Sequence, residues 1–187
     1  MDKNRVMALT DGIIAIAATI MVLELSVPEG GLTPDSLLEQ WPVLFAYAVS
    51  FSLIYLAWRS HHNAFQKADV ISVRTYIVNG IWLFFQTLVP FGTGLLGRYP
   101  DSRISAFVYV AVVFLWTFTF QFLDASIIAD NPGAEKDEVM HPVSRVIIFG
   151  GFALAFGAIL IRPMLALLVM AISNVFMGIR IIREKKC

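Results

Sequence analysis

Apolar residues fall into six long runs along the chain, separated by short polar or charged stretches. The runs cover residues 5–26, 37–58, 75–97, 104–128, 143–161 and 163–183. Each approaches the ~20 residues that an α-helix needs to cross ~30 Å of hydrocarbon. Because lipid offers no hydrogen-bond partner to an open backbone, we expect each run to be a membrane-spanning helix.

The composition agrees with a bilayer as the solvent. Of the 187 residues, 58% are hydrophobic and 15% are charged, whereas a soluble domain is about half apolar and about a quarter charged. The connecting stretches are too short to bury a core of their own. We therefore predict an all-α membrane protein in which residues 1–187 form a single six-helix transmembrane domain. The single cysteine, Cys187, excludes a disulfide within the chain.

The distribution of positive charge predicts the orientation of the helices. If the N-terminus is cytoplasmic, only three of the 14 Lys and Arg residues lie on the outer side, namely Arg98, Arg103 and Arg162. The other 11 lie on the inner side, as the positive-inside rule requires. An even number of spans then places both termini in the cytoplasm.

The first apolar run carries small and polar residues at helical spacing. On a helix, one narrow ridge, with spacings of three and four residues, contains Leu9, Gly12, Ile16, Thr19 and Leu23. Such a ridge indicates that the helix meets protein on this side. Two interpretations are open: the ridge is ordinary helix packing, or it lines a pathway on a symmetry axis.

An acid lies inside the same run. Asp11 is expensive to place in a membrane helix, so it should face a partner or water. His61 follows Trp58 by three residues and shares its helical face, and both lie at the depth of Arg5 and Asp11. We therefore predict a hydrogen-bond cluster of Arg5, Asp11, Trp58 and His61 that anchors the inner end of the first helix. Alternatively, Trp58 is an ordinary interfacial residue.

Other polar and small residues predict contacts within the bundle. Pro90 should bend the third helix, because proline removes a backbone hydrogen bond. Asn79 is expected to bond to another helix rather than to an ion. A tight hairpin of the last two helices is predicted by the small residues Gly150, Gly151, Ala153 and Gly157. We expect Ser173 and Asn174 to bond to the fifth helix across this hairpin.

Several motifs in the first half of the chain resemble the signature of the transmembrane protein 175 family. In the first helix, the resemblance to R-x-x-x-F-S-D and A-I-x-x-T-x-x-V-L-E rests on Arg5, Leu9-Thr10-Asp11, Ala15-Ile16, Thr19 and Val22-Leu23-Glu24. In later helices it rests on Trp58, His61 and Phe65, on Asn79, and on Pro90-Phe91-Gly92-Thr93. The chain departs from the family at Leu9-Thr10, where Thr10 keeps a hydroxyl and Leu9 loses an aromatic contact.

The resemblance implies a potassium-permeable channel in a bacterial inner membrane, with six-span subunits assembled as a homotetramer. The first helix of each subunit would line the pore, so Ile16, Thr19 and Leu23 would form stacked rings that act as the gate. Glu24 would lie at the outer mouth, where it either concentrates cations or is a solvated helix end. Asp11 would anchor the pore helix, the alternative being direct contact with the ion.

The same resemblance implies partners and excludes others. The permeant ions would be potassium and other monovalent cations, the remaining partners would be lipid and identical subunits, and no cofactor, resident metal or nucleic acid is expected. The family lacks a carbonyl selectivity filter, and this sequence has no T-V-G-Y-G stretch. His61-His62 is not a metal site, because adjacent side chains point apart on a helix and no HExxH motif is present.

Two other classes of function compete with a channel. A secondary or proton-coupled transporter would use Asp11 and His61, but such carriers usually contain paired broken helices, and only the third run contains a proline break. A membrane enzyme is not expected, because the sequence offers no nucleophile–base pair, metal motif or phosphate-binding loop.

Overall fold

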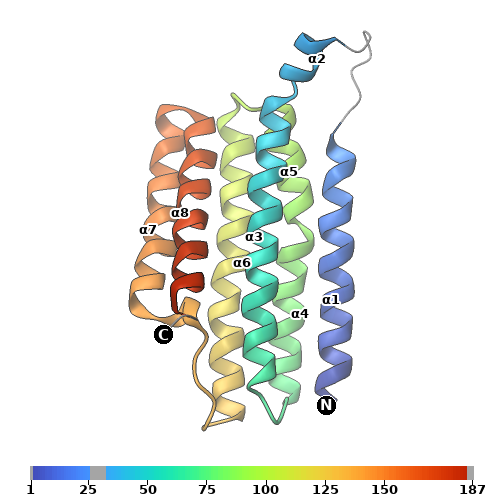
Figure 1. The fold of residues 1–187 in the computed structure, drawn as a ribbon, viewed down its shortest axis with the longest axis vertical. Helices are drawn as coiled ribbons and strands as arrows, with labels where there is room; N and C mark the ends of the chain where they lie inside the picture. The colour runs from blue at the N-terminus through green and yellow to red at the C-terminus, as the bar shows by residue number, and fades with distance from the viewer. Residues whose placement is uncertain (1, 26–32, 185–187) are drawn as a thin grey trace.

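The computed structural model describes residues 2–25 and 33–184. Figure 1 shows that the described elements stand side by side as a bundle of roughly parallel helices. The elements are α1 (Lys3–Ile20), η1 (Met21–Glu24), α2 (Pro34–Leu38), α3 (Trp41–Gln66), α4 (Val73–Thr87), α5 (Val89–Arg98), α6 (Arg103–Asp130), η2 (Glu138–Met140), α7 (Pro142–Ile161) and α8 (Pro163–Glu184). The elements labelled η are short 3₁₀ turns.

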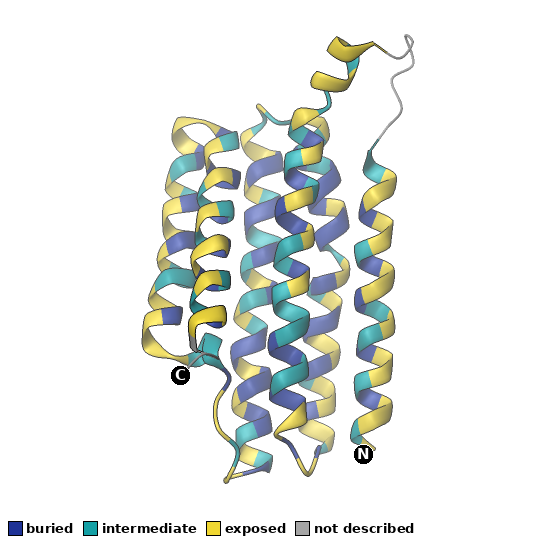
Figure 2. Ribbon diagram, viewed as in Figure 1, coloured by how far each residue is buried: buried dark blue, intermediate teal, exposed yellow. Residues whose placement is uncertain are grey.

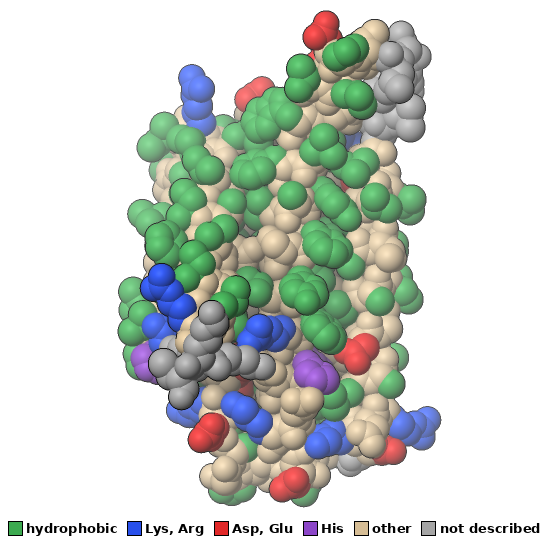
Figure 3. Space-filling model, in the orientation of Figure 1, with side chains coloured by type: hydrophobic (Ala, Val, Ile, Leu, Met, Phe, Trp, Pro, Cys, Tyr) green, Lys and Arg blue, Asp and Glu red, His purple; other side chains and the backbone are tan. Residues whose placement is uncertain are grey.

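Within the described residues, six stretches are long and apolar enough to cross a membrane. They are Lys3–Glu24, Trp41–Gln66, Val73–Arg98, Arg103–Asp130, Pro142–Ile161 and Pro163–Arg183. This result confirms the six predicted spans. Figure 3 agrees with it, because hydrophobic side chains cover the middle of the face in view while charged side chains gather toward the two ends.

The second span is longer than the sequence pattern predicts. The apolar run stops at residue 58, but α3 continues to Gln66, about two further turns. Ser60, His61, Ala64 and Phe65 are buried in this extension. The stretch is polar in sequence, yet it is helical because one of its faces packs against protein.

Pro90 interrupts the third span, as predicted. The span consists of α4 and α5, which meet at Leu88, and Pro90 lies in the first turn of α5. The stretch FGTGLLG belongs to α5 and is helical rather than a loop. The proline therefore starts a new helix at the point where it breaks the preceding one.

The helices form a central group with one flanking unit on each side. In Figure 1, α3, α4, α5 and α6 occupy the middle, α1 stands at one edge, and the α7–α8 hairpin stands at the other. The hairpin helices pack on each other and then on α6 and α3. Figure 1 shows that α1 begins and α8 ends toward the same end of the bundle, as an even number of spans requires.

The predicted hairpin contacts are confirmed in part. A Cβ added to Gly151 would overlap the hydroxyl of Ser173, so α7 and α8 approach closely at this position. The expectation for Asn174 is wrong: its Nδ2 donates to Ser52 Oγ at 2.6 Å and ties α8 to α3 instead of α7. Adjacent residues on a helix point in different directions, so only one of the two polar residues can face the hairpin partner.

The contact between α5 and α3 can be tested with glycine variants. A Cβ added to Gly97 would lie 3.0 Å from the Val43 Cα, so the two helices must separate. We expect Gly97→Ala to lower the free energy of unfolding by about 1–3 kcal/mol. The measurement is the melting temperature of the full chain in detergent, followed by circular dichroism.

Gly157→Ala is the matched control, because nothing lies within 4 Å of the Cβ that it adds. Alanine also favours a helix over glycine by up to about 1 kcal/mol, so the control should melt at the wild-type temperature or above it. Equal melting temperatures for the two variants would contradict the close contact.

Candidate functional site

The first helix has one packed face and one free face. Its buried residues form a single stripe that packs on the central helices and contains Val6, Thr10, Ile14, Ala17 and, in η1, Met21. The predicted ridge lies outside this stripe, and its large side chains are exposed in the single subunit: Leu9 by 51%, Ile16 by 59% and Leu23 by 75%. Gly12 and Thr19 are exposed as well. Figure 2 shows α1 as largely exposed, with only a narrow buried stripe.

The end of this helix differs from the predicted continuous α-helix over 5–26. Met21–Glu24 is a 3₁₀ turn, which advances about 120° and about 2 Å per residue instead of about 100° and about 1.5 Å. Leu23 therefore lies about 12 Å along the axis from Ile16 and about 40° around it. Since an apolar helix face is about 100° wide, Leu23 still shares the ridge with Ile16.

Thr19 presents an oxygen on the ridge. Its hydroxyl donates to the Ile16 carbonyl oxygen at 2.8 Å. With the proton directed at the backbone, the lone pairs of Thr19 Oγ1 are left for other partners. The ridge thus carries a hydrogen-bond acceptor between two large apolar side chains.

Among the described residues, Lys3 Nζ at the start of α1 donates to the Ala68 carbonyl oxygen at 2.7 Å, and two separate links between side chains hold the inner half of α1 to α3 and α4. Trp58 Nε1 on α3 donates to Asp11 Oδ1 at 2.9 Å. Asn79 Nδ2 on α4 donates to Thr10 Oγ1 at 3.0 Å, and Asn79 Oδ1 lies 2.9 Å from His61 Nε2. Because a carboxamide oxygen only accepts, His61 Nε2 carries the hydrogen in this arrangement.

The predicted four-residue cluster is thus only partly assembled. Asp11 and Trp58 meet, but His61 joins Asn79 and Thr10 instead. Arg5 is exposed and adds no hydrogen bond or ion pair to either link. Asn79 forms the interhelical bond expected of it. It lies on α4 and was not a member of the predicted cluster.

The outer end of the first span is also held by polar contacts. Thr93 Oγ1 on α5 lies 2.8 Å from Ser50 Oγ and 3.8 Å from Met21 Sδ. Glu24 turns toward α5, where its Oε2 lies 3.4 Å from Arg98 Nη2. A Cβ on Gly94 would overlap the Glu24 carboxylate, so a larger residue at this position would displace that carboxylate. Glu24 is therefore a paired charge within the subunit.

The sequence of the chain is similar to those of several known proteins. The sequence profile described as "Endosomal/lysosomal potassium channel TMEM175" matches residues 5–90. A potassium channel of Chamaesiphon minutus is 34% identical over 130 residues, covering 65% of this chain and 64% of that protein. A potassium channel of Chryseobacterium sp. is 31% identical over 142 residues, covering 75% of this chain and 73% of that protein.

The fold comparison covers nearly the whole chain. A crystal structure of a lysosomal potassium-selective channel TMEM175 homolog from Chamaesiphon minutus matches with a TM-score of 0.80 at 28% identity. The match covers 95% of this chain and 97% of that one. The chain belongs to the TMEM175 family. It is a multi-pass protein of the bacterial cell membrane.

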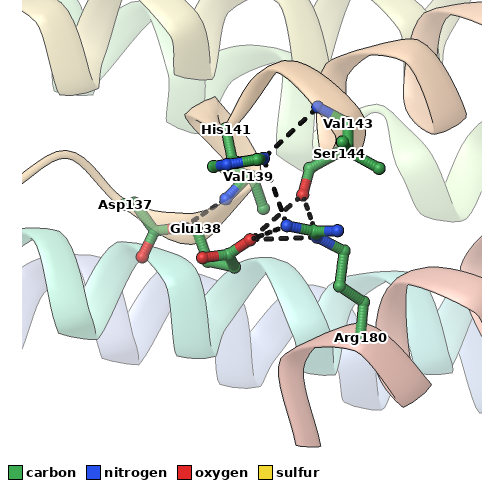
Figure 4. Close-up of polar contacts among 7 residues, drawn as sticks. All are labelled: Asp137, Glu138, Val139, His141, Val143, Ser144 and Arg180. Carbon is green, nitrogen blue, oxygen red and sulfur yellow. Dashed lines mark hydrogen bonds and ion pairs between the residues drawn. The ribbon is translucent and has the colours of Figure 1, made fainter. Parts of the chain in front are cut away.

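In this TMEM175-family chain, a second polar cluster holds the α7–α8 hairpin to the segment before it (Figure 4). Arg180 Nε donates to Glu138 Oε1 at 3.0 Å and to Ser144 Oγ at 2.9 Å, and its Nη2 lies 3.1 Å from His141 Nδ1. Nearby, burial raises the pKa of the Asp137 carboxyl, although hydrogen bonds from Val139 and Ser60 oppose the shift. Glu138 and Arg180 form the ion pair of this cluster.

The sequence did not predict the contacts at the outer end of the first span in this TMEM175-family chain. The sequence places Glu24 and Arg98 at the same outer depth, and their opposite charges are the signal that could have predicted this pair. Ser50 and Thr93 gave no comparable signal, because isolated hydroxyls in apolar runs are common and their partners depend on helix rotation.

The Asp11–Trp58 link can be tested with a double-mutant cycle. A hydrogen bond to a charged group contributes about 1.5–3 kcal/mol. We therefore expect Asp11→Ala and Trp58→Phe to show a coupling energy of about 1.5 kcal/mol in the unfolding of the detergent-solubilised chain.

Trp41→Phe combined with Asp11→Ala is the control cycle. Trp41 is on the same helix and is 55% exposed, so its effect should add to that of Asp11→Ala. Additive effects of Asp11→Ala and Trp58→Phe would show that the bond contributes nothing.

Proposed function

We propose that the chain is a subunit of a potassium-permeable cation channel, in which the α1 ridges of four identical copies surround one pore. The observation that carries this proposal is the free ridge of α1, which the subunit leaves uncovered although it contains Gly12 and Thr19 in the span. Such residues suit a helix that meets protein or water rather than lipid alone. The relatives named as potassium channels support the same function.

In this proposal the gate is made of side chains. Ile16 and Leu23 form two apolar rings, which close a pore by excluding water without any moving lid. The Thr19 ring lies between them and offers oxygen lone pairs to a dehydrating ion. When the helices move apart, water and ions enter and the hydroxyl oxygens replace part of the hydration shell.

The proposed channel has no carbonyl filter. The sequence contains no T-V-G-Y-G stretch, and FGTGLLG is part of a helix whose carbonyls bond within it. One ring of hydroxyls supplies fewer oxygen contacts than stacked backbone carbonyls do. We therefore expect a modest preference for potassium over sodium.

The pairing of Glu24 changes the role that we assign to it. A carboxylate beside Arg98 adds a weaker field to the outer mouth than a free one. We assign to Glu24 the positioning of the outer end of the pore helix, with Arg98 and Gly94, and a smaller effect on local cation concentration. Asp11 has the matching role at the inner end, through Trp58.

The competing function is a secondary or proton-coupled transporter that uses Asp11 and His61. His61 is only 1% exposed and is stacked on Trp82 with ring centroids 4.9 Å apart. Asp11 and His61 also belong to separate polar links. Single-channel steps in a planar bilayer would support the channel, whereas saturating flux with obligatory proton coupling would support the transporter.

Ile16→Asn tests the gate. A polar side chain in an apolar ring favours water in the constriction, and a barrier lowered by about 1.4 kcal/mol raises flux about tenfold. We expect a roughly tenfold higher basal potassium leak from liposomes that contain the purified variant. Ile172→Asn is the control, because Ile172 is 48% exposed on α8, away from the ridge. A leak unchanged by Ile16→Asn would remove the ridge from the permeation path.

Thr19→Val tests the selectivity ring, because it keeps the shape and removes the oxygen. We expect the potassium-over-sodium preference to fall toward one, measured as the reversal potential with potassium on one side and sodium on the other. Thr119→Val on α6 is the control, since Thr119 makes the same 2.8 Å bond to the carbonyl three residues earlier. A reversal potential equal to that of the wild type would show that Thr19 does not contact the ion.

A further inference from the structure

A cluster of polar side chains fastens α8 to the segment that begins α7. Arg180 of α8 donates to Glu138 of η2 and to Ser144 of α7, and its Nη2 lies 3.1 Å from Nδ1 of His141. Figure 4 shows these contacts converging on the Arg180 guanidinium. We refer to Arg180, Glu138, His141 and Ser144 as the hairpin clasp.

The Nδ1 atom of His141 accepts two hydrogen bonds in the closed clasp. The backbone N–H of Val143 donates to it at 3.3 Å, and Arg180 Nη2 donates to it at 3.1 Å. An imidazole nitrogen accepts only when it carries no hydrogen, so the hydrogen of the neutral ring lies on Nε2. The ring is exposed, so protons reach it from solvent. Because histidine changes its charge between about pH 5 and 8, both bonds depend on pH.

His141 also occupies a helix end where a positive charge is unfavourable. It is the N-cap residue of α7, and its ring caps the N–H of Val143. In α1, α4 and α6 the capping atom is an oxygen of Asp2, Ser72 or Ser102. A ring nitrogen, unlike a serine oxygen, stops accepting when it is protonated. The N-terminus of a helix carries a partial positive charge, which further disfavours a histidinium.

The neighbouring charges do not compensate for a proton on His141. The nearby acid Glu138 is already paired, with Oε1 at 2.9 Å from Arg180 Nη2. Burial raises the pKa of the Asp137 carboxyl, so acid lowers the negative charge of that side chain as well. Among the described side chains, the charged residues of the elements around the ring are Arg180 and Arg183 on α8, Arg145 on α7, Glu138 on η2 and Asp137 before it.

We propose that the hairpin clasp is a pH-sensitive switch, in which a proton on His141 Nδ1 releases the Val143 N–H and the Arg180 guanidinium and loosens α8 from η2 and α7. The closed clasp binds fewer protons at His141 than the open clasp, so it is favoured at pH 8 and weakened as the pH falls toward 5. The protonated Nδ1 becomes a donor and competes with Arg180 for the Glu138 carboxylate. The switch is separate from the α1 ridge and does not depend on ion permeation.

The first measurement determines where the hydrogens of the His141 ring lie. Nitrogen NMR of ring-labelled histidine in the purified full-length chain distinguishes the tautomers, and His141→Asn assigns the signal. We expect a neutral ring with its hydrogen on Nε2 at pH 8 and a doubly protonated ring at pH 5. A hydrogen on Nδ1 at pH 8 would overturn the proposal, because such a ring accepts neither bond.

The second measurement detects opening next to Arg180. Ile181 is 7% exposed and lines a small cavity together with Val139 of η2, so loosening of α8 from η2 uncovers it. In a Cys187→Ser background, the thiol-labelling rate of Ile181→Cys is divided by that of Ile182→Cys, whose position is 60% exposed. This ratio cancels the pH dependence of the thiol itself. We expect it to rise about tenfold from pH 8 to pH 5, as the loss of two hydrogen bonds implies.

Two matched variants assign the pH response to His141. Asparagine is a good N-cap whose oxygen does not titrate, so in His141→Asn the clasp should stay closed and the ratio should not change with pH. His62→Gln removes a histidine of α3, outside the clasp, and should keep the full rise. The titration of Asp137 is present in both variants and cancels in the comparison.

The proposal fails if the labelling ratio of the chain with His141 is the same at pH 8 and pH 5. It fails equally if His141→Asn shows the same rise as His62→Gln. Circular dichroism at pH 8 checks that both variants are folded. If His141→Asn is not folded, the tautomer of the His141 ring in the unaltered chain decides.

Discussion

The first helix must keep its position and rotation in the membrane although only one of its faces packs against the rest of the subunit. Within a bilayer, apolar contact between helices gains little, because lipid tails are as apolar as leucine. Polar links therefore decide where α1 stands. Trp58 holds Asp11, and Asn79 holds Thr10 with His61 behind it. The free ridge, and any pore that it lines, depends on these few hydrogen bonds.

The break in the third span allows polar contacts to hold the outer end of the first span as well. Pro90 lies in the first turn of α5. In α5, Thr93 contacts Met21 and Gly94 lies next to the Glu24 carboxylate. Arg98, at the end of this helix, pairs with Glu24. One interrupted span therefore contacts α1 through α4 at its inner half and through α5 at its outer half. The proline is useful because it permits two helix directions within one crossing.

The other side of the bundle is built differently. Aromatic rings connect α3, α4 and α6, with Trp82 stacked on His61 and 5.9 Å from Trp116 between ring centroids. The α7–α8 hairpin is tied on by Asn174 at Ser52 and by the Arg180 cluster. Between these ties the packing is incomplete, and it leaves a cavity of ≈ 110 Å³ whose walls include residues of α3, α6, α7 and α8. The molecule thus combines a first helix held by polar bonds with a peripheral hairpin that packs less completely on the central helices.

Hydropathy and spacing were sufficient to predict the number of spans, the helical class and the break at Pro90, because each is encoded locally as a period, a run length or a single residue. They failed at residues 59–66, where burial of His61 and Phe65 keeps a polar stretch helical. They also failed to predict the partners of Glu24, Asn174 and His61. A partner depends on how two helices rotate and at what depth they meet, and only packing of the whole bundle sets those two quantities.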